Sequence, residues 1–248
     1  MRNVISQMTD YCCFKYRGID KRLLEQLVHS RMYFPHRAQL NDPFDCNVDI
    51  LRAVDHAIAQ GTCKNPKLLV QFKNDEAVTH RFSENVAKLG IGSFSLTENE
   101  TLLWSHYAND HRGVVLRYDF PQGFLDDEDN ILGVSAVSYE PNSISGWLSE
   151  NAHLFEENHQ EFIIGLLKKV LMSKAPAWKY EQEARIVRPE VGLFDFPRET
   201  LTHIIFGLQT SGQDEELIRN LVEKYYTSVR FGRAVRIDDD FGIGTIEI

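Results

Sequence analysis

The chain has 248 residues, of which 43% are hydrophobic and 11% aromatic, so it can bury a core and is not generally disordered. Its 27 Lys and Arg residues against 36 Asp and Glu residues give a net charge of −9, which argues against a nucleic-acid coat or a polybasic membrane binder. No apolar run approaches the roughly 18–20 residues of a membrane span. The N-terminus turns polar within a few residues, unlike a signal peptide, and we expect a cytoplasmic protein.

The start of the chain predicts a strand, a helix and a turn. Residues 11–16 (YCCFKY) are rich in strand-forming types. A helix over 20–30 has Asp20 as its N-cap and leucines on one stripe. The segment 40–45 (LNDPFD) is a turn by composition, because Asn and Asp bond their own backbone and Pro43 keeps the preceding residue extended.

The rest of the chain mixes helices with short strands. Residues 48–89 predict helices around a loop near 61–66, and residues 90–97 alternate like a strand. Residues 113–118 and 133–139 predict two strands that pair with each other around an acidic loop. The remaining expected elements are a helix that begins at 98–100, an amphipathic helix over 160–172, strands over 184–187, 201–206 and 229–237, and a helix over 214–226.

Together these elements predict an α+β fold with split, largely antiparallel sheets and flanking helices. No repeat, low-complexity tract or linker divides residues 1–248, so we expect a single domain with a helical insertion around 48–89. The four cysteines form no CxxC pair and the nine histidines have no metal-binding spacing, so no metal site is expected. No glycine-rich phosphate-binding motif is present, which disfavours a doubly wound nucleotide fold.

Two segments contain residues suited to binding a nucleotide. Arg17, at the end of the first strand, can present its planar guanidinium to a phosphate or lie in solvent. Ser93 and Ser95 are two apart on a strand and therefore share one face, where their hydroxyls bind a ribose or form an ordinary polar face.

A short helix gathers aromatic and imidazole groups. Trp104 and Tyr107 are three residues apart and therefore neighbours, either in the core or on the wall of a ligand site. His106 is a titrating acid–base group or a core histidine with a backbone partner.

A pair of glutamates stands at the entry to a later strand. Glu181 and Glu183 are two apart, so both carboxylates can face one cleft and stabilise a cationic transition state or align a hydroxyl. The alternative is a salt-bridged strand face formed by Glu183 and Arg185.

Six short motifs follow one another along the chain: FKYR at 14–17, NDPFD at 41–45, SFS at 93–95, WSHYA at 104–108, RGV at 112–114 and WxxExExR at 178–185. In this order they resemble an uncharacterised bacterial family, a domain of unknown function, over nearly the whole chain. This resemblance implies no established activity.

A second resemblance concerns the chemistry. An arginine that ends the first strand, a Ser-x-Ser motif and a later Glu-x-Glu motif are similar to the Arg–Ser–Glu pattern of ADP-ribosyltransferases, with Ser-Phe-Ser in place of the commoner Ser-Thr-Ser. The resemblance implies an ADP-ribosyltransferase-like fold with NAD as co-substrate. Arg17 would hold the pyrophosphate or ribose, and Ser93, supported by Ser95, would orient the nicotinamide ribose. Glu183 would be the catalytic carboxylate, and Glu181 would position the acceptor.

The same resemblance makes Trp104, His106 and Tyr107 further cofactor-binding candidates, with Trp104 or Tyr107 stacked on the nicotinamide. It implies an ADP-ribosyltransferase or NAD glycohydrolase that acts as a bacterial effector, toxin or phage-defence protein. Its partners would be NAD, a protein or nucleic-acid acceptor, and an antitoxin or defence partner, without a membrane.

Two other functions stay open. A metal-dependent hydrolase or nuclease would use Asp42, Asp45, His106 and Glu183 around a divalent ion, although Asp42 also suits a backbone cap in a structural turn. A non-enzymatic module would sense a ligand through the aromatic cluster.

Overall fold

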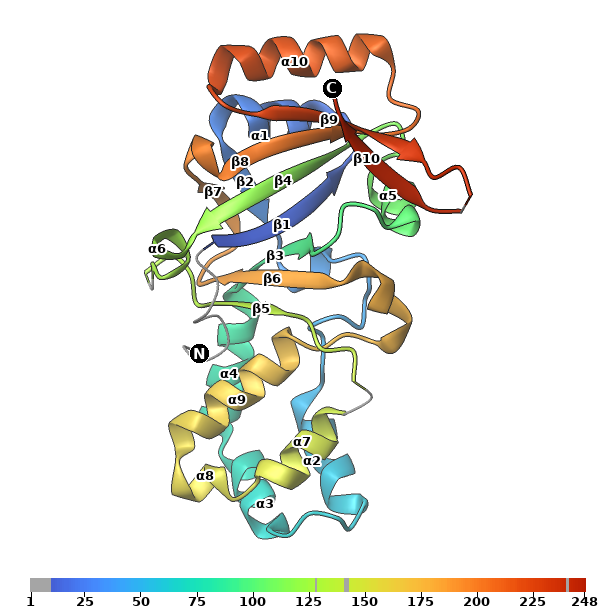
Figure 1. The fold of residues 1–248 in the computed structure, drawn as a ribbon. Helices are drawn as coiled ribbons and strands as arrows, with labels where there is room; N and C mark the ends of the chain where they lie inside the picture. The colour runs from blue at the N-terminus through green and yellow to red at the C-terminus, as the bar shows by residue number, and fades with distance from the viewer. Residues whose placement is uncertain (1–9, 128, 141–142, 240) are drawn as a thin grey trace.

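The computed structural model describes residues 10–127, 129–140, 143–239 and 241–248, and it confirms the predicted α+β fold (Figure 1). The strands are β1 (Asp10–Arg17), β2 (Arg31–Phe34), β3 (Gly90–Ser95), β4 (Val114–Pro121), β5 (Gly133–Ala136), β6 (Glu183–Arg188), β7 (Gly192–Asp195), β8 (Leu201–Phe206), β9 (Arg230–Arg236) and β10 (Ile243–Glu247). The helices are α1 (Lys21–His29), α2 (Ile50–Ala59), α3 (Pro66–Asn74), α4 (Glu76–Lys88), α5 (Thr101–Tyr107), α6 (Gln122–Leu125), α7 (Ile144–Asn151), α8 (Leu154–Glu157), α9 (His159–Leu171) and α10 (Gly212–Tyr225), with short 3-10 turns η1 (Arg37–Gln39), η2 (Pro176–Glu181) and η3 (Arg198–Thr200).

Eight of these strands form one sheet in the order β10-β9-β8-β4-β1-β3-β6-β5. The ladders are antiparallel except for β8–β9, which is parallel, and β2 and β7 pair antiparallel in a separate small sheet. The predicted pairing of 113–118 with 133–139 is wrong. β4 pairs with β1 and β8, whereas β5 pairs with β6 at the far edge of the sheet, because strands from elsewhere in the chain insert between them.

Helices cover the two faces of the sheet. α1 begins at the predicted cap, where Asp20 Oδ1 accepts from the backbone N–H of Leu23 at 2.8 Å. The apolar stripes of α1 and α10 pack on the inward residues of β4 and β8 in one core cluster. On the opposite face α5 packs Trp104 edge-on against Tyr16 of β1, with ring centroids 5.4 Å apart. The ends of β1 and β3 are thereby fixed between two packed layers.

A helical lobe lies beyond the β5 edge of the sheet (Figure 1). It combines α2, α3 and α4 with α7, α8 and α9 around a core of its own, in which the Phe72 and Phe162 ring centroids lie 5.1 Å apart. The segment 48–89 therefore forms only half of the lobe, and residues 144–171 form the other half. α9 leads directly into the segment that holds Lys174 and η2, so the lobe borders the site described below.

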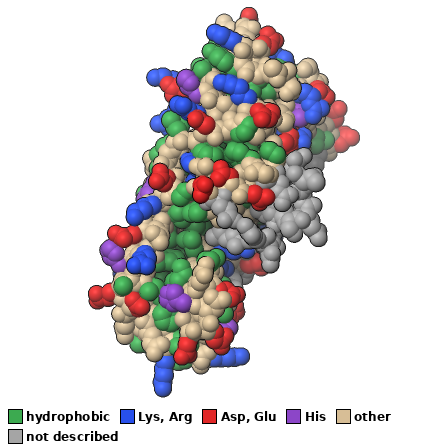
Figure 2. Space-filling model, turned by 90° about the vertical axis from the view of Figure 1, so that its left-hand side faces the viewer, with side chains coloured by type: hydrophobic (Ala, Val, Ile, Leu, Met, Phe, Trp, Pro, Cys, Tyr) green, Lys and Arg blue, Asp and Glu red, His purple; other side chains and the backbone are tan. Residues whose placement is uncertain are grey.

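Acidic and basic side chains are interspersed over the face shown in Figure 2. No helix among the described residues is long and apolar enough to cross a membrane.

Gly113 lies where the backbones of two other segments approach most closely. Its N–H donates to the carbonyl of Ala108 at 2.7 Å, and its carbonyl accepts from the hydroxyl of Thr210 at 2.8 Å. A Cβ at this position would lie 2.1 Å from the carbonyl oxygen of Arg17 and 2.9 Å from that of Ala108. Because both oxygens belong to backbone, any side chain here would displace the end of β1.

We expect Gly113→Ala to lower the free energy of unfolding by about 1–3 kcal/mol, the usual cost of forcing extra atoms into a packed site. Urea unfolding of the purified protein measures this loss. Gly212→Ala is the matched control, because a Cβ there meets no atom within 4 Å. An equal effect of the two substitutions would contradict the close packing at Gly113.

Candidate functional site

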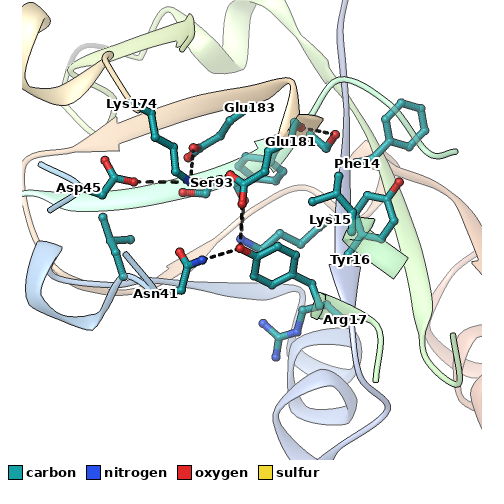
Figure 3. A pocket seen from close by; sticks show the side chains of 15 residues that line it. Phe14, Lys15, Tyr16, Arg17, Asn41, Asp45, Ser93, Lys174, Glu181 and Glu183 are labelled. Atoms are coloured by element: carbon teal, nitrogen blue, oxygen red, sulfur yellow. Dashed lines mark hydrogen bonds and ion pairs between the residues drawn. The ribbon is translucent and has the colours of Figure 1, made fainter. Parts of the chain in front are cut away.

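A pocket of about 290 Å³ opens at the ends of β1 and β3 and the start of β6, near the lower end of the roughly 300–1,000 Å³ range of small-molecule sites (Figure 3). Six of the predicted site residues line it: Arg17, Ser93, Ser95, Tyr107, Glu181 and Glu183. They come from four segments that are distant in the sequence. The structure therefore brings the predicted arginine, serine and glutamate motifs to one place.

The deepest part of the site is a network around Arg185, whose side chain is 0% exposed. Its Nε and Nη2 donate to the two carboxylate oxygens of Glu183 at 2.7 and 3.0 Å, and Nη2 also donates to Asp45 at 2.6 Å. Nη1 donates to the carbonyl of Leu171, at the end of α9, at 2.6 Å and to Cys46 Sγ at 2.9 Å. A buried guanidinium needs partners for all its donors, and here β6, the 41–45 turn and α9 supply them.

Lys174 joins both glutamates of the predicted pair. Its Nζ lies 2.5 Å from Glu181 Oε2, 3.1 Å from Glu183 Oε2 and 3.7 Å from Asp45 Oδ2. Gln182, between the glutamates, has a left-handed backbone with φ of 43°, which turns the chain from η2 into β6. Both carboxylates line the same pocket, and both are also salt-bridged.

The opposing charges set the ionisation of this network. Burial raises the pKa of Glu183, but the charge and hydrogen bonds of Arg185, the charge of Lys174 and a hydrogen bond from Ser93 outweigh it and lower the pKa to about 2. Burial lowers the pKa of Lys174, but Glu183, Glu181 and Asp45 outweigh it and raise the pKa above its usual value. At neutral pH Glu183 and Lys174 are therefore ionised.

Tyr107 connects the outer carboxylate to the 41–45 turn. Its hydroxyl donates to Glu181 Oε1 at 2.8 Å and accepts from Asn41 Nδ2 at 2.5 Å. Burial and this bond to Glu181 raise the pKa of the phenol well above its usual value, so it remains a proton donor. The motifs NDPFD, WSHYA and WxxExExR therefore meet in one hydrogen-bonded cluster.

The charges of the pocket are segregated. Its described lining residues include three carboxylates and three cations. Figure 3 shows Asp45, Lys174 and Glu183 on one side and the β1 residues Lys15 and Arg17 on the other. Arg17 lies at the end of β1, as predicted, and its Nη2 is 3.9 Å from Asp20 Oδ1. Arg17 thus lies apart from the carboxylates, whereas Lys174 is paired with them and Lys15 reaches the carbonyl of Ser93 between the two sides.

The two serines have different environments. Ser95 is buried; its hydroxyl donates to the carbonyl of Glu181 at 2.8 Å and accepts from the N–H of Thr97 at 3.1 Å. It therefore holds the backbone of Glu181 in place. Ser93 is only partly buried and lies on the pocket wall beside Glu183. Ser93 is the serine whose position suits contact with a ligand.

Two of the aromatic candidates lie outside the pocket. Trp104 is 0% exposed, packs in the core against Tyr16 and donates its indole N–H to the carbonyl of Glu98 at 2.9 Å, so stacking of Trp104 on a ligand does not fit this position. His106 is exposed beside Tyr107 and Tyr180, with ring centroids 6.3 and 6.4 Å away, and does not line the pocket. Because α5 faces the core and the pocket with different sides, Tyr107 is the one of these three candidates that lines the pocket.

The acidic residues proposed as ligands of a divalent ion are engaged in other interactions. Asp42 Oδ1 accepts from the N–H of Phe44 at 2.9 Å, which is the backbone cap that the sequence also allowed. Asp45 and Glu183 are paired with Lys174 and Arg185, which occupy the space that a cation would need. Among the described residues no group of three or more His, Cys, Asp or Glu side chains could hold a metal ion.

Sequence reasoning missed Lys15 and Lys174 as site residues. Lys15 lies two residues before Arg17 on β1, and this spacing could have indicated it, because alternate residues of a strand share a face. Lys174 follows α9 and has no motif of its own. Only the packing of α9 against β6 brings its ammonium group to the glutamates.

We expect the free energy of unfolding to fall as the pH decreases through 4.5 toward about 2, because a carboxyl group whose pKa is lowered by folding stabilises the fold only while it is ionised. The contribution of Glu183 is about 3 kcal/mol by this linkage. Glu183→Gln removes this contribution. The difference in free energy of unfolding between the wild type and this variant, measured by urea unfolding, should therefore narrow from about pH 6 to about pH 3. The control Glu190→Gln, at an exposed position of the same segment, should show no narrowing, and a constant gap for Glu183→Gln would refute the assignment.

Comparison with known proteins finds a family match for residues 103–186. The model of a family described as "Protein of unknown function (DUF2971)" matches this range, which includes Tyr107, Lys174, Glu181 and Arg185. No curated protein and no solved structure matches the chain. The match confirms a resemblance to an uncharacterised family over residues 103–186, whereas the predicted resemblance also included the motifs at 14–17, 41–45 and 93–95, which lie outside this range.

Proposed function

We propose that this protein is an NAD-dependent ADP-ribosyltransferase-like enzyme, which breaks the bond between nicotinamide and ribose and transfers ADP-ribose to an acceptor or to water. The observation that supports the proposal is that Arg17, Ser93 and Glu183, from three separate motifs, line one pocket. The proposal includes a cytoplasmic effector, toxin or phage-defence role with a protein or nucleic-acid acceptor.

The segregated charges suit the charge distribution of NAD. The pyrophosphate would lie against Arg17, whose guanidinium can form two parallel hydrogen bonds to phosphate oxygens. The cationic nicotinamide ribose would lie toward Glu181 and Glu183, with Ser93 beside it. Carboxylates placed there favour the positive charge that develops on the ribose as nicotinamide leaves.

The two glutamates would have different roles, because their partners differ. Glu183 is held by Arg185 and Lys174, and its low pKa keeps it ionised, so it would supply a fixed negative charge. Glu181 is held by Lys174 and by the neutral phenol of Tyr107. A substrate hydroxyl can displace the neutral phenol of Tyr107 from Glu181 at a lower free-energy cost than it could displace the guanidinium of Arg185 from Glu183. Glu181 would therefore bind the ribose or the acceptor.

We expect the purified protein to release nicotinamide from NAD, which chromatography of the reaction mixture measures. Glu181→Gln should lower kcat by about 100-fold or more, the usual contribution of a positioned acid–base group, when turnover is measured below the melting temperature of the variant. Arg17→Gln should mainly raise KM. Glu190→Gln is the control and should retain wild-type activity.

Two outcomes would contradict the proposal. If Glu181→Gln and Glu183→Gln both keep full turnover while folded, the carboxylates are not catalytic. If NAD raises the melting temperature but is recovered intact after prolonged incubation, the pocket binds a ligand without reaction and the protein is a sensor.

A further inference from the structure

Lys15 is a pocket residue for which the proposed function has no role. It lies on β1 two residues before Arg17, so both side chains project from the same face of the strand. Its Nζ donates to the carbonyl oxygen of Ser93 at 2.5 Å and lies 5.2 Å from the ring centroid of Phe94. The ammonium group thus reaches the pocket wall at Ser93, and Arg17 lines the same pocket (Figure 3).

The two lysines of the pocket differ in their partners. Lys174 forms ion pairs with three carboxylates, at 2.5, 3.1 and 3.7 Å. In the part of the chain that the structure describes, no carboxylate lies within 4.0 Å of Lys15 Nζ, and its hydrogen-bond partner is a neutral carbonyl. Lys15 therefore has no close anion that would hold it in the charged form.

The charged groups that face Lys15 favour its neutral form. Burial and the nearby charge of Arg17 lower the pKa of Lys15 to about 8, against the opposing effects of Glu183 on β6 and Cys13 on β1. About one tenth of the amine is therefore unprotonated at pH 7, and most of it remains charged. An unprotonated lysine amine is a nucleophile toward carbonyl carbon.

We propose that Lys15 is a reactive amine that forms an imine with a small phosphorylated aldehyde, whose phosphate group is held by Arg17. The proposal goes beyond the proposed function and does not depend on NAD. Both residues extend from β1 into the same pocket, which places a phosphate beside Arg17 and a carbonyl carbon beside Lys15 Nζ. Phosphate would form charge-assisted hydrogen bonds with a guanidinium whose nearest ion pair, among the described residues, is the 3.9 Å contact with Asp20.

The reaction balances without an oxidant or reductant. The lone pair of the Lys15 nitrogen forms a bond to the carbonyl carbon, and a proton moves from nitrogen to the carbonyl oxygen to give a carbinolamine. The C–O bond then breaks, the hydroxyl leaves as water with the second amine proton, and a C=N bond remains.

The test uses pyridoxal 5′-phosphate as the probe, followed by borohydride reduction and peptide mass mapping of the whole protein. At about pH 7.5 we expect Lys15 to be labelled about 100-fold faster than an exposed lysine such as Lys21, because its pKa of about 8 lies about two units below the usual lysine value of about 10.4. Labelling of Lys15 should rise with pH with a midpoint near 8. Lys174, which is paired with carboxylates, is the internal control and should not react.

Two variants separate the roles of the amine and the phosphate site. Lys15→Arg keeps the positive charge and a donor for Ser93 but cannot form the imine, so the fast labelling should disappear while the melting temperature stays unchanged. Arg17→Gln should lower the ratio of labelling by pyridoxal 5′-phosphate to labelling by pyridoxal, which lacks the phosphate, by about tenfold.

Labelling of Lys15 no faster than that of exposed lysines would overturn the reactive amine. An unchanged ratio in Arg17→Gln would overturn the phosphate site. Neither measurement involves NAD, so these outcomes are independent of nicotinamide release.

Discussion

The buried guanidinium of Arg185 is the interaction on which the rest of the site depends. It bonds Glu183 on its own strand, Asp45 in the 41–45 turn and the carbonyl of Leu171 at the end of α9, so one side chain joins the sheet, the turn and the helical lobe. Removing one partner of a buried charge network commonly costs about 3–5 kcal/mol, because the remaining charges lose their compensation. The arrangement of Lys174 and Glu181 around the pocket follows from this anchor.

The site also shows how an acidic chain can accommodate an anionic ligand. The net charge of −9 is spread over the molecule, whereas Lys15 and Arg17 place two positive charges on one strand face at the pocket wall. Glu181 and Glu183 remain across the pocket because Lys174 and Arg185 neutralise them. Such segregation favours a ligand with an anionic end and a cationic or hydroxyl-bearing end.

Much of the secondary structure could be predicted because its signals are local. The Asp20 cap, the strand over 201–206 and the apolar face of α9 depend on neighbouring residues alone. The neighbours of β4 and β5 in the sheet could not be predicted in this way. Alternation shows that a segment is a strand but not which strand lies beside it. The same limit applies to α5. The spacing of Trp104 and Tyr107 predicts that they are neighbours, but not which of them faces the core.

By itself the sequence determined the residue types of the site, namely an arginine that ends a strand, serines two apart on another strand and a pair of glutamates before a third. It also determined the α+β class, because helix caps and strand alternation are short-range effects. Only the tertiary structure decided that these motifs share one pocket, that Lys15 and Lys174 belong to it, and that Trp104 does not. The physical reason is that burial and ion pairing join segments far apart in the chain, and these long-range contacts set both the charges of the carboxylates and the side chains that a ligand can reach.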